Sequence, residues 1–355
     1  MKTIHQTPSI RIISLCAAIA ASAAGTAHAE GSILPGITMY GVADIYGEYG
    51  KGDRNEVSVN SGGLSGSRLG FDAVHDLGNG LKAIAKLEAG INLDSGSSGQ
   101  GGVLFGRQAY AGVSGSFGAL TAGRQYAPQF NALDADDPFD TGAGSAISSG
   151  IVSIFASRVN NSVVWNTPAV GDFSASVMLA AGESTTGSQT NSSIGEVNLH
   201  LGNASFGLDL VVSGEKKAID TGTNASATML GGFYDFGAVK VMGGVQFVTN
   251  STRAPATDDN RREFWAGVNV PIGADSLWLG AGGSKVNKVS GSTASQYSVA
   301  YVHPLAKGFD VYGVLTSISN GDATAYSDDT ATGSGPAVSA GKSASAAQVG
   351  FRYRF

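Results

Sequence analysis

The C-terminal segment alternates two kinds of side chain, residue by residue. One parity holds Val349, Phe351, Tyr353 and Phe355, and the other holds Gln348, Gly350, Arg352 and Arg354. Because successive side chains of a strand point to opposite faces, this strand has one aromatic face and one basic face. Such a strand would promote aggregation in water. In a transmembrane β-barrel the aromatic face meets lipid, so we expect Arg352 and Arg354 to face a water-filled lumen.

The N-terminal segment is typical of a secretory signal peptide. Lys2 and Arg11 flank an apolar run, and Ala27-His28-Ala29 forms a small-x-small cleavage site, which predicts a signal peptide over 1–29 and one mature domain over 30–355. A short anchor helix is the alternative. Cleavage would remove Cys16, the only cysteine, and two of the 22 basic residues but none of the 28 acidic ones, so the net charge changes from −6 to −8. We therefore expect no disulfide, no thiolate metal site and no nucleic-acid partner.

Short and long polar connections alternate along the chain. The short turn signals, which have Gly, Asn, Asp or Pro where tight hairpins prefer them, lie at 76–80, 115–118, 169–172, 202–205, 235–238, 271–275 and 304–308. The long stretches lie near 50–63, 94–103, 126–156, 182–192, 214–226, 250–261, 285–293 and 320–343. About fifteen connections join about sixteen strands. The sequence therefore predicts an all-β, antiparallel transmembrane barrel of 16 strands, with short periplasmic turns and long extracellular loops.

Chain length and strand patterning agree with a wide barrel. Strands of about 11 residues and turns of about four leave about 15 residues for each long loop. In the segment 81–91, Lys82, Lys86 and Glu88 share one parity, which predicts that they face the lumen. A barrel of about sixteen strands leaves an aqueous channel. The mean hydropathy of +0.06 fits a barrel, because only every other residue meets lipid.

The first strand has small residues on its expected outer face. Met39, Gly41, Ala43 and Ile45 share that parity. Small residues suit a protein–protein contact better than lipid, which suggests an oligomer, with weak packing as the alternative.

Four internal motifs and the C-terminus carry a resemblance to a known family. They are MYGVAD from Met39, SRLGF from Ser67, FGRQAYAGV from Phe105, FGALTAGRQY from Phe117 and FRYRF from Phe351. The chain resembles, over its whole mature length, the general porins of Gram-negative outer membranes, especially the beta-proteobacterial branch. The resemblance implies a homotrimer in the outer membrane, in contact with lipid and lipopolysaccharide. It also implies delivery by the barrel assembly machinery, with Phe355 as the assembly signal.

The resemblance also implies a constriction made by the third long loop. That loop, 126–156, would fold into the lumen and present Asp134, Asp136, Asp137 and Asp140. The opposing basic residues would be Arg68, Arg107, Arg124 and Arg158. Each arginine could instead be a salt-bridged wall residue, and the aspartates a solvated acidic loop. The small apex 142–150 adds no charge.

Parity bears on the arginines separately from the resemblance. Arg68 lies opposite in parity to Leu69 and Phe71. The parity of Arg107 predicts that Gln108 and Tyr110 point outward. Arg124 shares parity with Leu120 and Ala122, so it can face the lumen only if a bulge or strand end intervenes.

Physical reasoning gives the expected function and its rivals. Arginines facing acids across a narrow, wet gap create a transverse field that orients water and polar solutes. We expect passive diffusion of small hydrophilic solutes and ions, with a channel specific for a sugar or carboxylate as the alternative. An enzyme is disfavoured because His75, His200 and His303 lack a nucleophile and an orienting group nearby. No metal or cofactor site is expected. A soluble β-sandwich or adhesin is disfavoured by Phe355 and by the alternation of turns and loops.

Overall fold

The computed structural model describes residues 32–182, 192–216, 224–250, 260–328 and 335–355, and the predicted signal peptide lies outside these ranges. The first half of the barrel consists of β2 (Ile37–Lys51), β3 (Asn55–Ser61), β4 (Arg68–Gly78), β5 (Leu81–Asn92), β7 (Gln108–Gly115), β8 (Gly118–Tyr126), β9 (Arg158–Asn166), β10 (Phe173–Ala180) and β11 (Ser193–Gly202). The second half consists of β12 (Phe206–Lys216), β13 (Ala225–Asp235), β14 (Lys240–Thr249), β15 (Arg261–Ile272), β16 (Asp275–Val286), β17 (Ala294–Ala306), β18 (Phe309–Asn320) and β19 (Ala344–Arg354).

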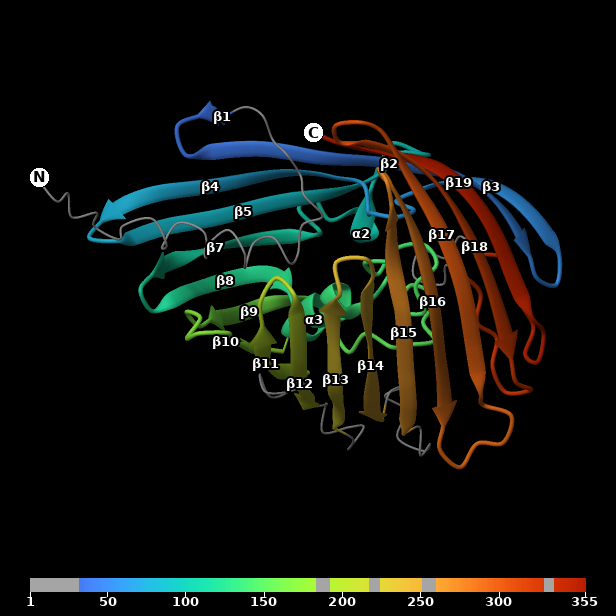
Figure 1. Ribbon diagram of the computed structural model, residues 1–355. Coiled ribbons are helices and arrows are strands. Elements are labelled where there is room, and N and C mark those ends of the chain that lie inside the picture. The colour runs from blue at the N-terminus through green and yellow to red at the C-terminus, as the bar shows by residue number, and fades with distance from the viewer. Residues whose placement is uncertain (1–31, 183–191, 217–223, 251–259, 329–334) are drawn as a thin grey trace, which may run out of the picture.

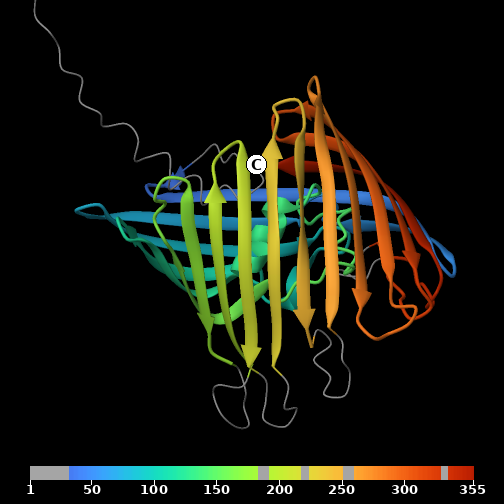
Figure 2. The same cartoon turned by 60° about the horizontal axis from the view of Figure 1, so that its bottom comes forward.

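These strands close into an antiparallel barrel (Figures 1 and 2). β19 pairs with β2, from Ser345 opposite Lys51 to Arg354 opposite Val42, so the sheet has no free edge there. β3 and β4 pair with successive parts of β2 and together form one barrel strand, which gives the sixteen strands that the sequence predicts. The short β1 (Ser32–Leu34) pairs with β2, and β6 (Ser97–Ser98) pairs with β5 just before α2 (Gly99–Gly102); none of them is one of the sixteen wall strands. The helix α3 (Pro128–Asp136) lies inside the ring of strands (Figure 1).

One predicted long loop is largely a strand. The stretch 50–63 contains β3, which forms a hairpin with the end of β2. Val57 and Val59 are exposed and alternate with Ser58 and Asn60, so the segment has a strand period that its polar composition obscures. The seven short turns lie at the positions predicted for them, each joining two paired strands. In the described part of the chain, no helix is long and apolar enough to cross a membrane.

The strands alternate as their sequences predict. On β19, Val349, Phe351 and Tyr353 are exposed on the outer face, whereas Gln348 and Arg352 are buried on the inner face. The Phe355 ring lies over Gly41 on β2, and the two backbones exchange hydrogen bonds of 2.8 and 3.0 Å. A larger residue at position 41 would displace this ring. The Phe355 ring of the same chain therefore explains why position 41 is glycine, and no contact with a second subunit is needed to explain it.

Candidate functional site

The connection between β8 and β9, residues 127–157, folds back into the barrel and lies along one wall. The Gln129 amide donates to Gln246 Oε1 at 2.5 Å, and its own Oε1 accepts the Phe155 backbone N–H at 2.7 Å. Further along, the Ser153 hydroxyl donates to the Glu263 carboxylate at 2.8 Å. These bonds join the loop to β14 and β15. The third long loop therefore lies inside the lumen, where it was predicted to fold.

Apolar side chains fill the space between this loop and its wall. Leu133, Ile147 and Ile151 of the loop pack in one buried cluster with Met229 and Trp265 of the wall. Burial of a large apolar side chain contributes about 1.5–3 kcal/mol. The Trp265 indole also donates to the Asp136 carbonyl at 3.0 Å. The loop is therefore held as a packed part of the protein.

The small apex of the loop reaches across to further strands. Gln296 on β17 donates to the Gly144 carbonyl at 2.9 Å, and the Ala143 backbone N–H donates to Gly63, between β3 and β4, at 2.8 Å. Short side chains at the apex permit this close approach to the wall. The apex bears no ionisable side chain, as expected from its composition.

Three arginines gather around Glu88 and Tyr126 on the opposite wall. Arg107 Nε donates to Glu88 Oε1 at 2.7 Å, and Arg68 Nη1 lies 4.0 Å from Glu88 Oε2. Arg107 and Arg158 both donate to the Tyr126 hydroxyl, at 2.6 and 2.8 Å. We call Arg68, Arg107 and Arg158, with Glu88 and Tyr126, the arginine cluster. Three positive groups and one negative group give it a net charge of +2.

A bend between β3 and β4 positions Arg68 at the start of β4. Asp44 on β2 is fully buried and accepts the Gly63 and Ser65 backbone N–H groups at 3.1 and 2.8 Å. It also accepts the Tyr312 hydroxyl at 2.6 Å. These bonds satisfy the backbone of the bend, which would otherwise be unpaired inside the barrel. The final Asp of the MYGVAD motif therefore shapes the wall that carries Arg68.

A second basic group lies on β19. Arg352 and Arg354 both pair with Asp310, at 2.9 and 2.7 Å, and Arg352 also donates to Ser65 Oγ at 2.7 Å. On β5, Lys86 pairs with Asp72 at 3.0 Å, and Lys82 is exposed on the same inward parity. Two cations sharing one carboxylate leave the β19 group net positive. The predicted lumenal residues of β5 and β19 thus lie on the inner face.

The four loop aspartates divide into two pairs. Asp134 is half-buried and accepts the Thr141 hydroxyl at 2.7 Å, and Asp140 is exposed. Burial and the nearby Asp140 carboxylate raise the pKa of Asp134 to about 7, while Arg68 opposes this rise. Asp136 and Asp137 are fully buried, which corrects the prediction that they line the passage. Asp137 accepts the Thr141 backbone N–H at 2.9 Å, so it stabilises the turn after α3.

The prediction that Arg124 needs a bulge in order to face the lumen can be compared with the strand register. The register between β8 and β9 shifts between Gly123 and Gln125. This is the kind of bulge that Arg124 needs if its side chain is to face the lumen. Arg124 donates to the Gly106 carbonyl and to Asn160, and in the described structure no contact joins it to Glu88. Whether it lines the passage stays a prediction.

The prediction for the neighbours of Arg107 is wrong. Gln108 and Tyr110 lie opposite Glu88 and Lys86 in register, so they face inward. Arg107 precedes β7, and strand alternation does not extend to it. Its side chain can therefore reach Glu88 even though the next residue also points into the barrel.

Comparison with known proteins gives the family. A model described as Gram-negative porin matches residues 16–323. The chain belongs to this family. Outer membrane porin protein 32 of Delftia acidovorans is 30% identical over 371 residues, which cover 96% of this chain and 99% of the relative.

Solved porin structures agree with the fold. The anion-selective porin from Comamonas acidovorans has a TM-score of 0.78 at 27% identity, over 90% of this chain and 99% of that one. OmpT of Vibrio cholerae, in its trimer form, has a TM-score of 0.66 at 18% identity, over 90% and 99% of the two chains, which is a likeness of fold. This chain is an outer-membrane porin of a Gram-negative bacterium, and proteins of this family and fold act as channels.

Several residues of the porin site escaped sequence reasoning. Tyr126 joins two arginines, yet it ends a strand, where alternation gives no direction. Tyr40 donates to Glu88 Oε2 at 2.7 Å from β2 and fixes that carboxylate. Both tyrosines belong to the motifs that carry the family resemblance, and the motifs are the only sequence signal for them. Glu88 was expected in the lumen, but its role as the shared counter-ion depends on distances between strands.

Proposed function

We propose that this porin is a general diffusion channel for small hydrophilic solutes and ions, with a preference for anions. The observation that carries the proposal is the arginine cluster, in which Arg68 and Arg107 pair with the Glu88 carboxylate and Arg158 joins Arg107 at the Tyr126 hydroxyl. Asp134 and Asp140 oppose it from the loop. An incompletely compensated basic wall raises the local concentration of anions in a narrow aqueous passage.

The field across the passage also explains selection for polar solutes. Water between the basic wall and the loop carboxylates is oriented, and an apolar solute must displace it. The constriction residues in this proposal are Arg68, Arg107 and Arg158, together with Asp134 and Asp140. The selectivity named for the Comamonas porin supports the proposed sign, because that protein is 27% identical over nearly its whole length.

The biological setting belongs to the same proposal. Residues 1–29 are removed as a signal peptide, and 30–355 form a single barrel domain without catalytic activity. Three copies assemble, as the trimer form of OmpT suggests for the fold. The exposed aromatic face of β19, ending in Phe355, supports contact with outer-membrane lipid and a role in barrel assembly.

Reversal potentials in a planar lipid bilayer test the preference. Under a KCl gradient, wild-type channels should give a potential of the sign expected for chloride permeation. The double variant Arg68→Ala with Arg158→Ala should lose most of that potential, because two of the three cluster cations are gone. Arg262→Ala is the matched control, since Arg262 is exposed on the outer face of β15, and it should change the potential little.

Two results would contradict the proposal. If the double variant keeps the wild-type potential, the cluster does not set selectivity. If the conductance is small and is blocked by one sugar or carboxylate, a substrate-specific channel replaces general diffusion.

A further inference from the structure

The eighth long loop, which joins β18 to β19, enters the barrel. The structure describes this loop over 321–328 and 335–343. Gln348, on the inner face of β19, donates to Asp328 Oδ2 at 2.9 Å, and Asp328 is 3% exposed. Gln348 lies four residues along β19 from Ala344, which is about 13 Å at about 3.3 Å per residue. The loop therefore reaches into the lumen and does not lie wholly over its mouth.

A single amide at the end of β18 fixes the shape of this loop. The Asn320 side chain accepts the Tyr326 backbone N–H at 2.8 Å and donates to the Tyr326 carbonyl at 2.9 Å. The same side chain donates to the Lys342 carbonyl at 2.8 Å. Because Tyr326 and Lys342 belong to the two limbs of the loop, Asn320 holds both limbs together and sets the position of the Tyr326 side chain.

Arg261 on β15 bonds to two loops at once. Its Nη2 atom donates to the Ile151 carbonyl of the third loop and to the Tyr326 hydroxyl of the eighth loop, both at 3.0 Å. This nitrogen carries two hydrogens, so each loop can accept one of them. Arg261 Nε lies 3.1 Å from Glu263 Oε1, and the arginine side chain is only 12% exposed. A planar guanidinium with fixed donor directions suits a residue that holds two acceptors in place.

Apolar packing joins the same two loops. Tyr326 and Val338 of the eighth loop are half-buried and pack against the buried cluster that contains Ile147 and Ile151 of the third loop. Movement of the third loop would therefore break contacts with the eighth loop as well as contacts with the wall. Each added contact raises the free energy needed to open a segment locally.

We propose that the eighth loop clamps the third loop in place, and that Tyr326 and Arg261 are positioning residues for the passage. Both act through the third loop, which Arg261 contacts at Ile151. The clamp rests on the proposed channel, because the third loop must border the ion path for its position to matter. When the clamp opens, the third loop can move towards the basic wall and close the passage briefly.

Hydrogen exchange and single-channel recording of the refolded, full-length mature protein test the clamp. The amides of 147–152 report on the third loop, since several bond within it, such as Val152 to the Ala146 carbonyl at 2.8 Å. Tyr326→Phe removes only the hydroxyl that Arg261 contacts. These amides should exchange about 10-fold faster, and brief closures in a planar lipid bilayer should become about 10-fold more frequent. That change corresponds to about 1.4 kcal/mol, the size expected for a hydrogen bond from a charged donor.

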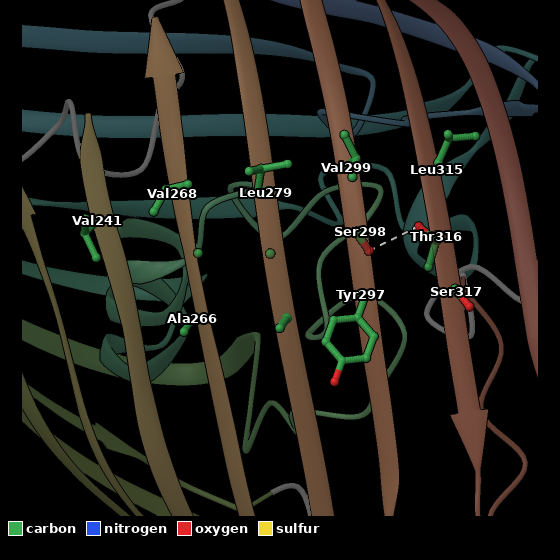
Figure 3. A pocket seen from close by; sticks show the side chains of 13 residues that line it. Val241, Ala266, Val268, Leu279, Tyr297, Ser298, Val299, Leu315, Thr316 and Ser317 are labelled. Carbon is green, nitrogen blue, oxygen red and sulfur yellow. Dashed lines mark hydrogen bonds between the residues drawn. The ribbon is translucent and has the colours of Figure 1, made fainter. Parts of the chain in front are cut away.

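Tyr297→Phe is the matched control. It also removes one tyrosine hydroxyl, but Tyr297 lies on the outer face of β17 and is 65% exposed (Figure 3). Both the exchange of 147–152 and the frequency of closures should equal those of the wild type.

Two further variants separate the hydrogen bond from the packing. Tyr326→Ala removes the ring as well as the hydroxyl, so it should loosen the third loop more than Tyr326→Phe does. In an Arg261→Gln background, Tyr326→Phe should have no further effect, because the hydroxyl acts through the guanidinium. The amides of β17, β18 and β19 should exchange as in the wild type in both Tyr326 variants, which shows that the barrel is folded.

Three results would refute the clamp. Wild-type exchange of 147–152 in Tyr326→Phe would mean that the hydroxyl does not hold the third loop. An equal effect of Tyr326→Phe with and without Arg261 would mean that Tyr326 acts by another route. Faster exchange throughout β17, β18 and β19 would reduce Tyr326 to a general contribution to stability. The reversal potential under a KCl gradient should keep its wild-type value in Tyr326→Phe, so failure of the clamp is distinguishable from failure of the proposed anion preference.

Discussion

The two walls of the passage use polar residues in opposite ways. Under the third long loop, Gln246 and Glu263 of the wall bond to each other and to Gln129 and Ser153 of the loop, and Gln129, Gln246 and Glu263 are almost completely buried. On the basic wall, Arg68 keeps 15% of its side chain exposed and Lys86 keeps 19%. The polar side chains of Gln129, Gln246 and Glu263 are paired within the protein, whereas the basic wall leaves positive charge for the solution to balance.

The difference separates stability from selectivity. A buried polar group must find its partner inside the protein, because an unpaired one costs about 1–3 kcal/mol. Groups that meet solutes need incomplete pairing, since a fully neutralised cluster has little attraction for ions. We therefore expect changes on the loop wall to alter unfolding first, and changes on the basic wall to alter ion selectivity first. The predictions below test that separation, starting with the largest effect.

Trp265→Ala should give the largest loss of stability, about 3–5 kcal/mol in the free energy of unfolding. Trp265 is 2% exposed and links the apolar cluster to the Asp136 carbonyl. Denaturant unfolding of the refolded protein measures the loss. Trp165→Ala is the control, because Trp165 is 43% exposed on the outer face and should cost much less. Equal losses in the two variants would mean that the loop is not a packed part of the fold.

Glu88→Gln should affect both properties. It removes the shared counter-ion of the arginine cluster, so we expect a loss of about 3 kcal/mol together with a larger chloride potential. Asp72→Asn is the control, since its pair with Lys86 is partly exposed and should be worth less than about 1 kcal/mol. A Glu88→Gln channel with unchanged selectivity would show that the cluster lies away from the path of the ions.

Sequence patterns predict one wall better than the other. Strand count, turns, outward faces and the basic residues follow from alternation and from family motifs, because these signals lie within single strands. The packing of the loop against its wall cannot be predicted in this way. Alternation predicts polar residues at the inward positions of a wet lumen, but Val211, Met229 and Ile318 are apolar there. They are apolar because the loop covers them. That contact joins residues more than 50 positions apart and has no local period.

The sequence also does not show which of the four loop aspartates are buried. Asp134, Asp136, Asp137 and Asp140 lie within one short segment, and composition gives them equal weight. The turn after α3 buries Asp136 and Asp137 and leaves Asp134 half-buried and Asp140 exposed. A segment without a strand period gives no parity from which to predict this division.

Asp136→Asn should stabilise the protein by about 1 kcal/mol at pH 8. Both carboxylate oxygens of Asp136 are buried without a hydrogen-bond partner in the described structure. Burial and the Asp209 carboxylate raise its pKa well above the usual value. Since the folded pKa is raised, the penalty is absent below the unfolded pKa and grows as pH rises, so the gain should vanish at pH 4. Asp140→Asn, at an exposed position, should change stability by less than about 0.5 kcal/mol.

The smallest predicted effect is a pH dependence of selectivity that couples the two walls. Asp134 has a pKa of about 7, so it gains a proton as pH falls from 8 to 6. The loop then loses a negative charge that faces Arg68, and the chloride potential under a KCl gradient should rise modestly, with a midpoint near pH 7. Asp134→Asn should hold the channel in the low-pH state and remove this step. Asp72→Asn should keep the step. If the potential still rises near pH 7 in Asp134→Asn, another group carries the titration, and if the wild-type potential falls instead, the loop carboxylates do not face the ion path.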